Sequence, residues 1–276
     1  MKKLIQSLVF LLLISCVEKN ENKVLSKKFG LDSFPVETSI QGEKIFIESV
    51  LNPNKILLKD GFLVVSEEGF GNLLHIIKQD GLLYQSSIGK QGQGPGEIKT
   101  GIWELDRGIN KGNFWAYDLQ AKTFYEYSLE DTSSTAKRSI QQNEAWFLGY
   151  SMHWIDSNKI ISYVSRDSFK FGIFDTLGSR ISSLGPWSLE KEVDESMGYA
   201  LMGLYQGPIE YNFKSKILVF ASSKFESFQI FNLKTGQVIS LTGPGNIKLE
   251  YEINTDGNAP FAILNPDIPR GYIDVF

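Results

Sequence analysis

The body of this chain is a series of short apolar runs separated by turn residues. Ile56–Leu58 and Phe62–Val65 flank Asp60-Gly61, and a second pair of apolar runs flanks Asp80-Gly81. Asp-Gly between apolar runs is a strong hairpin signal, because both central residues of a type I′ turn need positive φ. No stretch of the body has the apolar spacing of a long amphipathic helix. The sequence therefore predicts an all-β fold and not a parallel βαβ fold.

A strand end followed by a turn recurs along the chain. Lys78, Asp118, Asp175 and Asn232 each end an apolar run before a turn, at spacings of 40, 57 and 57 residues. Each repeat has an earlier apolar strand and a later strand after the turn, which makes a four-stranded antiparallel unit. This is the build of a β-propeller blade. A β-sandwich also uses many short strands, but it does not predict a recurring unit. The longest insertion, Ser188–Leu204, is expected to be a loop.

The composition agrees with stacked sheets and excludes several kinds of site. Aromatic residues make up 13% of the chain, and they can fill the space between blades. The formal net charge is −4, which argues against a nucleic-acid partner because such proteins carry a basic stripe. One Cys and two His exclude an internal disulfide and a Cys/His zinc site. No metal or cofactor is expected.

The N-terminus has the pattern of a secretory signal. Met1-Lys2-Lys3 is basic, and Leu8–Ile14 is an apolar run too short to span a bilayer. The run ends at Ser15, which precedes Cys16, the chain's single cysteine. This arrangement resembles a bacterial lipoprotein signal, which implies that residues 1–15 are removed and that Cys16 is acylated. The alternative is an ordinary signal peptide with an incidental cysteine.

Residues 16–27 are polar and lack periodicity, so we expect a flexible tether followed by a propeller domain over 28–276. The resembled lipoproteins that stay at the inner membrane carry Asp after the cysteine, whereas this chain has Val17. The resemblance therefore implies an outer-membrane lipoprotein that faces the periplasm or the cell surface. The lipid would make the membrane one partner of the protein.

A glycine-rich segment, Ile88–Ile98, is the most unusual part of the body. It lacks the Gly-Lys-Ser/Thr of a Walker loop, and Pro95 interrupts any dinucleotide fingerprint. One interpretation is a blade-to-blade crossover that bends where only Gly fits. The other is a nest of backbone N–H groups that binds an anion at one mouth of the propeller. The candidate ligand-binding residues are Lys90, Gly92, Gly94, Gly96 and Glu97.

This glycine loop after a hairpin, in a lipoprotein with blade-like repeats, resembles the TolB-like six-bladed β-propeller lipoproteins of gram-negative bacteria. The resemblance covers most of residues 30–276 and implies a fold and a location in the cell envelope, but no catalytic residues. The chain departs from six blades, because we recognise four units ending near Leu241. Gly271–Phe276 reads like the first strand of another blade, so we expect a ring that is incomplete at the C-terminus or has degenerate last blades. A closed ring would pair a strand such as Lys44–Glu48 with C-terminal strands.

Few residues of the sequence suggest a catalytic role. His75 lies in an apolar strand and is expected to be a core or blade-packing residue. His153 and Asp156 are three residues apart, so a strand would place them on opposite faces. Asp118 and Asp175 are expected to shape turns. No Gly-x-Ser-x-Gly elbow occurs, and we assign no catalytic residue.

Three weaker candidates remain. Glu190–Glu195 forms an acidic loop that could bind Ca²⁺ or simply be solvated. Trp187 and Tyr199 could stack on a sugar or cap a blade. A further set of carboxylates could meet at the axis for glycoside chemistry. These carboxylates are Glu97, Asp106 and Glu144.

Two functions follow from these patterns. The first is a lipid-anchored, non-catalytic module that binds a protein, peptide or glycan of the envelope. The alternative is an envelope hydrolase or lyase that acts on polysaccharide or peptide at the propeller mouth. An enzyme should gather carboxylates, or a His and a carboxylate, with shifted pKa values in the central funnel.

Overall fold

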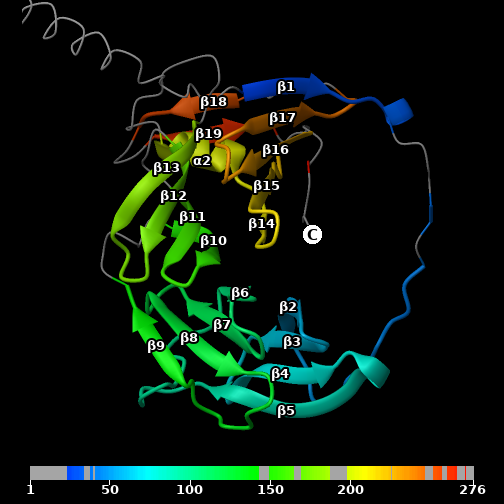
Figure 1. Ribbon diagram of the computed structural model, residues 1–276, viewed down its shortest axis with the longest axis vertical. Helices are drawn as coiled ribbons and strands as arrows, with labels where there is room; N and C mark the ends of the chain where they lie inside the picture. Colours follow the sequence, from blue (N-terminus) through cyan, green and yellow to red (C-terminus); the bar gives the residue numbers. More distant parts are fainter. Residues whose placement is uncertain are drawn as a thin grey trace, which may run out of the picture.

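The protein is a β-propeller of four-stranded antiparallel sheets, as the sequence predicts. The computed structural model describes residues 24–33, 38–39, 41–142, 149–164, 169–186, 198–224, 226–245, 251–256, 260–265 and 271. Over these residues, four sheets contain their strands in consecutive order, so each sheet is a meander. The sheets are arranged in an arc around a common centre (Figure 1). The β-sandwich alternative is therefore wrong.

In each sheet the strand nearest the centre comes first in the chain (Figure 1). We number the sheets as blades along the chain. Blade 1 consists of β2 (Pro53–Lys59), β3 (Phe62–Glu67), β4 (Asn72–Lys78) and β5 (Leu83–Lys90). Blade 2 consists of β6 (Glu104–Asp106), β7 (Asn113–Asp118), β8 (Thr123–Ser128) and β9 (Arg138–Gln141). Blade 3 consists of β10 (Gly149–Asp156), β11 (Lys159–Val164), β12 (Phe169–Asp175) and β13 (Arg180–Pro186). Blade 4 consists of β14 (Ile209–Asn212), β15 (Ile217–Ala221), β16 (Ser227–Asn232) and β17 (Val238–Thr242).

A strand near the N-terminus adds to the outer edge of blade 4. β1 (Val24–Lys28) pairs in parallel with β17, from Val24 opposite Val238 to Lys28 opposite Thr242. It precedes a short 3-10 helix, η1 (Leu31–Ser33), and it covers an edge that would otherwise expose unpaired backbone groups.

β1 corrects two expectations. The predicted tether 16–27 extends too far, because Val24 to Lys27 form ladder bonds in a strand. The strand expected at Lys44–Glu48 is not found, and the N-terminal strand instead lies on blade 4. Both errors have one cause. Val24–Lys28 contains only two apolar residues, so its strand character comes from pairing with β17 and not from its own pattern.

The remaining elements lie beside blades 3 and 4. The helix α2 (Gly198–Tyr205) occupies the end of the insertion that was expected to be a loop throughout. β18 (Tyr251–Asn254) and β19 (Phe261–Leu264) form a two-stranded hairpin whose Ala262 and Leu264 pack on the core between blades 3 and 4. No helix in the described part of the chain is long and apolar enough to cross a bilayer.

Aromatic rings fill the space between neighbouring blades, as the composition predicts. Trp115 of blade 2 stacks on Trp154 of blade 3, with ring centroids 4.6 Å apart. Between blades 3 and 4, Tyr163 stacks on Phe220 at 5.9 Å. Each such pair adds about 0.5–1.5 kcal/mol beyond the apolar area it buries.

The predicted repeat is present, but its alignment is one strand out of register in blade 2. Lys78, Asp175 and Asn232 each end the third strand of a blade, whereas Asp118 ends the second strand, β7. The equivalent residue of blade 2 is Ser128, and the spacings become 50, 47 and 57 residues. The misalignment arises because β7 and β8 carry similar aromatic runs and similar tight turns.

The two Asp-Gly hairpins both form, with different turns. Asp60 and Gly61 have φ of 48° and 82°, as a type I′ turn requires. In the second hairpin the positive φ values fall one residue later, on Gly81 (68°) and Leu82 (50°), after a short 3-10 turn, η2 (Asp80–Leu82). The strand pairing predicted from Asp80-Gly81 is therefore confirmed, but its turn type is wrong.

Candidate functional site

The innermost strands of the four blades bring charged side chains together around the centre of the propeller. These strands are β2, β6, β10 and β14, the ones nearest the centre in Figure 1. We call the group the axial cluster. Its members are Lys55, Lys59, Glu104, Asp106, Arg107, His153 and Glu210.

His153 links three blades at the core of this cluster. Its Nδ1 lies 2.8 Å from Oδ2 of Asp106, and its Nε2 lies 2.9 Å from the backbone oxygen of Ile209. Both oxygens are acceptors, so both ring nitrogens donate and the ring is an imidazolium. Burial lowers the pKa of His153, but the hydrogen bond and charge of Asp106, with Glu210 and Glu104, outweigh it and raise the pKa to about 9.

The two carboxylates of β6 are held in different ways. Asp106 uses its second oxygen to accept the backbone N–H of Gly108 at 2.5 Å. Glu104 accepts the backbone N–H of Leu105 at 3.2 Å, and its other oxygen lies 3.7 Å from Nζ of Lys55. Burial raises the pKa of Glu104, while the charges of Lys55 and His153 oppose the rise. Burial thus favours the protonated form of Glu104.

Arg107 connects blade 2 to blades 1 and 4. Its guanidinium forms an ion pair with Glu210 of β14 and donates from Nε to the backbone oxygen of Leu58 at 3.2 Å. Lys59 of β2 in turn donates to the backbone oxygen of Arg107. Burial lowers the pKa of Lys59, although Asp60 and Asp106 oppose this. Together with His153, these contacts join the inner strands of all four blades.

In the glycine-rich loop, the predicted ligand-binding residues bind one another. Nζ of Lys90 lies 2.6 Å from one oxygen of Glu97, and the other oxygen accepts the backbone N–H of Gly94 at 2.8 Å. The hydrogen bond from Lys90, followed by that from Gly94, lowers the pKa of Glu97. Glu97 thus occupies the position at which an external anion would meet Lys90.

The other contacts of this loop are those of a crossover between blades. The backbone N–H of Gly92 donates to the oxygen of Ile98 at 2.9 Å. Gly96 has φ of 74°, and its oxygen accepts the backbone N–H of Ala136 at 2.9 Å. A Cβ on Gly96 would lie 3.0 Å from the backbone oxygen of Ala136, so this position favours glycine for both φ and space. The contacts favour the crossover interpretation, and ligand binding by the loop stays a prediction.

The sequence profile of the family described as "TolB-like 6-blade propeller-like" matches residues 29–276. This chain belongs to the TolB-like six-bladed propeller family. The resemblance to the TolB-like propellers, stated from the glycine loop and the repeats, is confirmed, and the lipid anchor stays a prediction.

Solved structures show the same fold at low identity. A candidate exported protein of Bacteroides fragilis is 14% identical with a TM-score of 0.50, over 80% of this chain and 60% of that chain. A member of the DUF4221 family from Bacteroides vulgatus is 12% identical with a TM-score of 0.50, over 71% of this chain and 59% of that chain. This TolB-like chain thus spans about three fifths of the length of these structures. No curated protein matches it significantly.

The other sequence candidates in this TolB-like propeller have structural partners. His75 is buried, with Nδ1 3.2 Å from the hydroxyl of Tyr84 and Nε2 2.8 Å from Oε2 of Glu67. Asp118 accepts the backbone N–H groups of Thr100 and Ala121. Asp175 accepts two backbone N–H groups within its own turn. The packing role of His75 and the turn roles of both aspartates are confirmed.

Several candidates do not meet or lie elsewhere. Glu97 and Asp106 bind different partners, so the axial carboxylate set is not assembled as proposed. Cys16, Glu144, Trp187, Glu190–Glu195 and the side chain of Tyr199 lie outside the described residues. Within the described ranges, no group of three or more His, Cys, Asp or Glu side chains could hold a metal ion.

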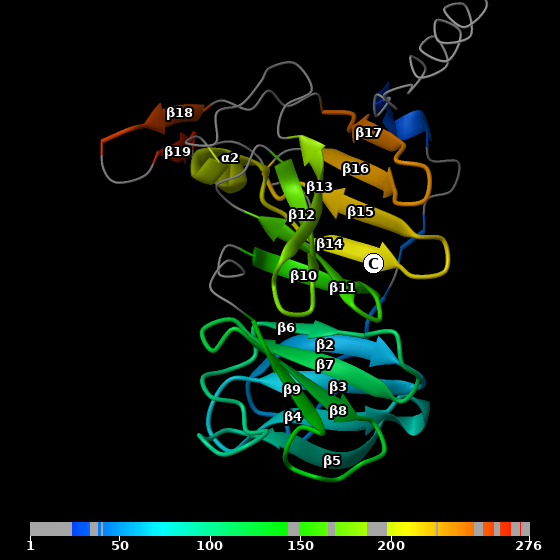
Figure 2. The same cartoon turned by 60° about the vertical axis from the view of Figure 1, so that its left-hand side comes forward.

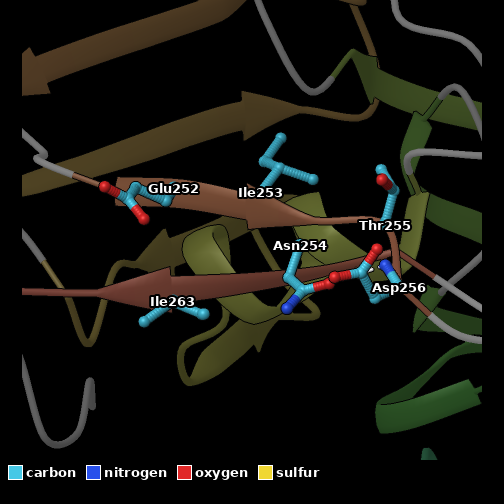
Figure 3. Close-up of a pocket in the computed structure, with 6 residues that line it drawn as sticks. All are labelled: Glu252, Ile253, Asn254, Thr255, Asp256 and Ile263. Atoms are coloured by element: carbon cyan, nitrogen blue, oxygen red, sulfur yellow. Dashed lines mark hydrogen bonds between the residues drawn. The ribbon is translucent and has the colours of Figure 1, made fainter.

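A pocket of about 240 Å³ lies at the β18–β19 hairpin (Figure 3), and none of the residues that line it belongs to the axial cluster. Its lining includes Glu252, Asn254 and Ile263, and Oδ1 of Asn254 accepts the backbone N–H of Asp256 at 2.6 Å. No residue that the sequence singled out lines it. The axial cluster, with its mutually bound and partly buried charges, remains the candidate functional site.

The axial cluster meets the criterion that would favour an enzyme, since it brings together His153 and the carboxyl group of Glu104, both with raised pKa values. Its hydrogen bonding points the other way. A general base needs a free nitrogen to accept a proton, whereas His153 donates from both nitrogens. The sequence named Asp106 as a carboxylate of the axis but missed its pairing with His153, because it compared His153 with nearby Asp156, whereas Asp106 lies 47 residues away on another blade.

Proposed function

We propose that this TolB-like propeller is a non-catalytic binding or scaffold module of the cell envelope, anchored to the outer membrane through lipid on Cys16. One observation carries the proposal. The axial cluster joins the inner strands of four blades through groups that bind one another, and His153 has no nitrogen free for catalysis. A rigid propeller mouth suits recognition of a protein, peptide or glycan. The Bacteroides fragilis protein described as a candidate for export has the same fold, which supports an envelope location.

An envelope hydrolase or lyase is the second candidate, and Glu104 is the observation that favours it. Burial raises the pKa of this carboxyl group, which is the property of a general acid. Its neighbours weigh against the idea, because Lys55 lies 3.7 Å from it and the nearby imidazolium favours its ionised form. The binding module therefore accounts for more of the cluster.

Ligand capture tests the binding function at the axis. Lys55 lies on the inner strand β2 and is half exposed beside Glu104, so Lys55→Glu reverses a charge of the axial cluster without emptying the core. The mature wild-type chain is immobilised and incubated with envelope extract. We expect it to retain a component of the extract, and we expect the Lys55→Glu chain to retain about tenfold less of that component. Lys99→Glu, at an exposed site in the loop after blade 1, is the matched control and should retain it fully. No retained component would contradict binding, and equal retention by both variants would contradict a site at the axis.

Substitution of Cys16 tests the anchor separately. Cys16→Ser removes the sulfur that lipid would modify, so we expect loss of acyl labelling and release of the protein from membranes. Metabolic labelling with a fatty acid and membrane fractionation measure the two effects. Continued labelling of the Cys16→Ser chain would show that the lipid lies elsewhere.

A further inference from the structure

Two neighbouring turns at one end of blade 4 carry three lysines and an exposed phenylalanine. The turns connect β14 to β15 and β16 to β17, and they project side by side from the same edge of the blade (Figure 2). The backbone N–H of Leu233 in the second turn donates to the oxygen of Lys216 in the first at 2.9 Å, so the turns are in contact. We call this group the blade 4 lysine patch. It consists of Phe213, Lys214, Lys216 and Lys234.

The patch contains no carboxylate on either turn. Asn212 accepts the backbone N–H groups of Lys214 and Ser215, and Asn232 accepts those of Lys234 and Thr235. In blade 3 an aspartate, Asp175, holds the equivalent turn. Blade 4 thus holds its turn with a neutral amide where blade 3 uses a carboxylate.

Blades 1 and 2 each carry acids in these turns, although the β6–β7 turn of blade 2 has none and includes Lys111. Blade 1 has Asp60 and Asp80, and blade 2 has Glu130 and Asp131. Toward blade 3, Asp156 is half-buried at the end of β10 and accepts the hydroxyl of Ser157 at 3.1 Å. In a chain with a formal net charge of −4, blade 4 therefore presents a local excess of positive charge.

The aromatic ring of the patch is suited to a bilayer interface. Phe213 is 47% exposed, and Nζ of Lys216 lies 3.6 Å from the centroid of its ring. An exposed aromatic ring beside lysines is the combination that enters the headgroup region of a membrane.

The N-terminal strand places this patch near the proposed anchor. Val24 pairs with Val238, which directly follows the second turn of the patch. Cys16 precedes Val24 by eight residues, so the cysteine lies within about 28 Å of Val24 even if the chain between them is fully extended. A lipid on Cys16 would hold this end of blade 4 close to the membrane.

We propose that the blade 4 lysine patch is a docking surface for the anionic headgroups of the membrane that carries the protein. The proposal rests on the lipid anchor of the proposed function. Each lysine near an anionic surface contributes by charge attraction, and salt weakens the attraction. The patch thereby orients the propeller, with the turns of blade 4 against the bilayer and the axis free to bind its ligand.

Vesicle binding tests the surface without the lipid. The chain from position 16 carrying Cys16→Ser is mixed with vesicles of phosphatidylcholine alone or with phosphatidylglycerol, and bound protein is measured by sedimentation. We expect binding only to vesicles with phosphatidylglycerol. Lys214→Glu with Lys234→Glu should lower the partition coefficient at least about tenfold. The matched control, Lys99→Glu with Lys224→Glu, changes charge equally at the opposite ends of the strands and should bind like wild type.

Three outcomes would overturn the docking surface. These are no binding to phosphatidylglycerol vesicles, equal binding to both kinds of vesicle, and equal loss in the two double variants. Thermal unfolding of both variants should match wild type, because all four side chains lie on turns or loops. Acyl labelling is measured separately, on the protein that keeps Cys16. If Cys16 is labelled but the Cys16→Ser chain does not bind anionic vesicles, the patch alone is refuted. If Cys16 is not labelled but the Cys16→Ser chain binds these vesicles, the anchor alone is refuted.

Discussion

Replacing Lys170 with Met should stabilise the protein, most strongly at and below pH 7. Lys170 on β12 is only 3% exposed, between blades 3 and 4. Its Nζ donates to Oε1 of Gln229 at 2.7 Å and lies 5.0 Å from the ring centroid of Tyr205 and 5.2 Å from that of Phe220. Among the described residues, the groups that face it are two aromatic rings and one neutral amide. The ammonium is therefore desolvated without a compensating charge.

The sign of the effect follows from the pKa of Lys170, which burial lowers from 10.5 to about 7. Protonation of Lys170 is less favourable in the folded protein than in the unfolded chain. This cost is fully present below pH 7 and disappears as the pH rises through the unfolded value of 10.5. The shift corresponds to an upper bound of about 5 kcal/mol. Loss of the bond to Gln229 offsets about 1–3 kcal/mol, so Lys170→Met should gain about 2 kcal/mol at pH 6.

Urea unfolding at pH 6 and pH 10 measures this effect. The gain from Lys170→Met should be large at pH 6 and absent or reversed at pH 10, where the wild-type lysine is closer to neutral in both states. Lys99→Met, at an exposed site, is the control and should change stability by less than about 0.5 kcal/mol at either pH. A destabilised Lys170→Met protein at pH 6 would show that the buried ammonium is better compensated than its contacts indicate.

Replacing His153 with Leu should have the opposite effect, a loss of about 3 kcal/mol near pH 6. The change leaves Asp106, which is 6% exposed, buried without its positive partner, and it leaves the oxygen of Ile209 without a donor. Breaking a buried charge pair from one side typically costs about 3–5 kcal/mol. The inner strands β6, β10 and β14 should all be loosened by this one change.

Its pH dependence is also opposite. The pKa of His153 is raised from 6.5 to about 9, so its stabilisation is fully present below pH 6.5 and is lost as the pH rises through 9. The deficit of His153→Leu should therefore shrink above pH 9. In the wild type, between pH 7 and 9, His153 lowers the free energy of unfolding as the pH rises, whereas Lys170 raises it. Stability should fall across that range in Lys170→Met and rise in His153→Leu.

A double-mutant cycle decides whether Asp106 is the partner responsible. His153→Leu, Asp106→Leu and the double variant are unfolded in urea at pH 6, and their free energies of unfolding are compared. The double variant should lose clearly less than the sum of the single variants, because neither leaves a lone charge. Additive losses would mean that the pair contributes nothing beyond packing.

Much of the fold follows from local patterns. Asp60-Gly61 predicts its hairpin because only certain residues adopt positive φ, and the recurring unit predicts blades because one sheet cannot bury both faces alone. The same reasoning fails where two neighbouring strands have similar sequences. Asp118 was aligned with residues that end the third strand of a blade although it ends the second, because β7 and β8 look alike in sequence.

The candidate site could not be predicted in this way. Strand alternation relates His153 only to residues near it, whereas Asp106 lies on a different blade. The sequence around Lys170 does not indicate that this lysine is buried, since Phe169 beside it is 37% exposed while the lysine is 3% exposed. Both environments arise at contacts between blades.

The sequence by itself determined most strands of the blades, the blade as the repeating unit and the chemistry available at Cys16, because each depends on residues that are neighbours in the chain. The tertiary structure alone decided which charges meet at the axis, that Glu97 binds its own loop, and that β1 brings the N-terminal segment to the lysine turns of blade 4. These contacts depend on the placement of one blade against another. That placement comes from burying aromatic faces, and the burial specifies no particular polar partner.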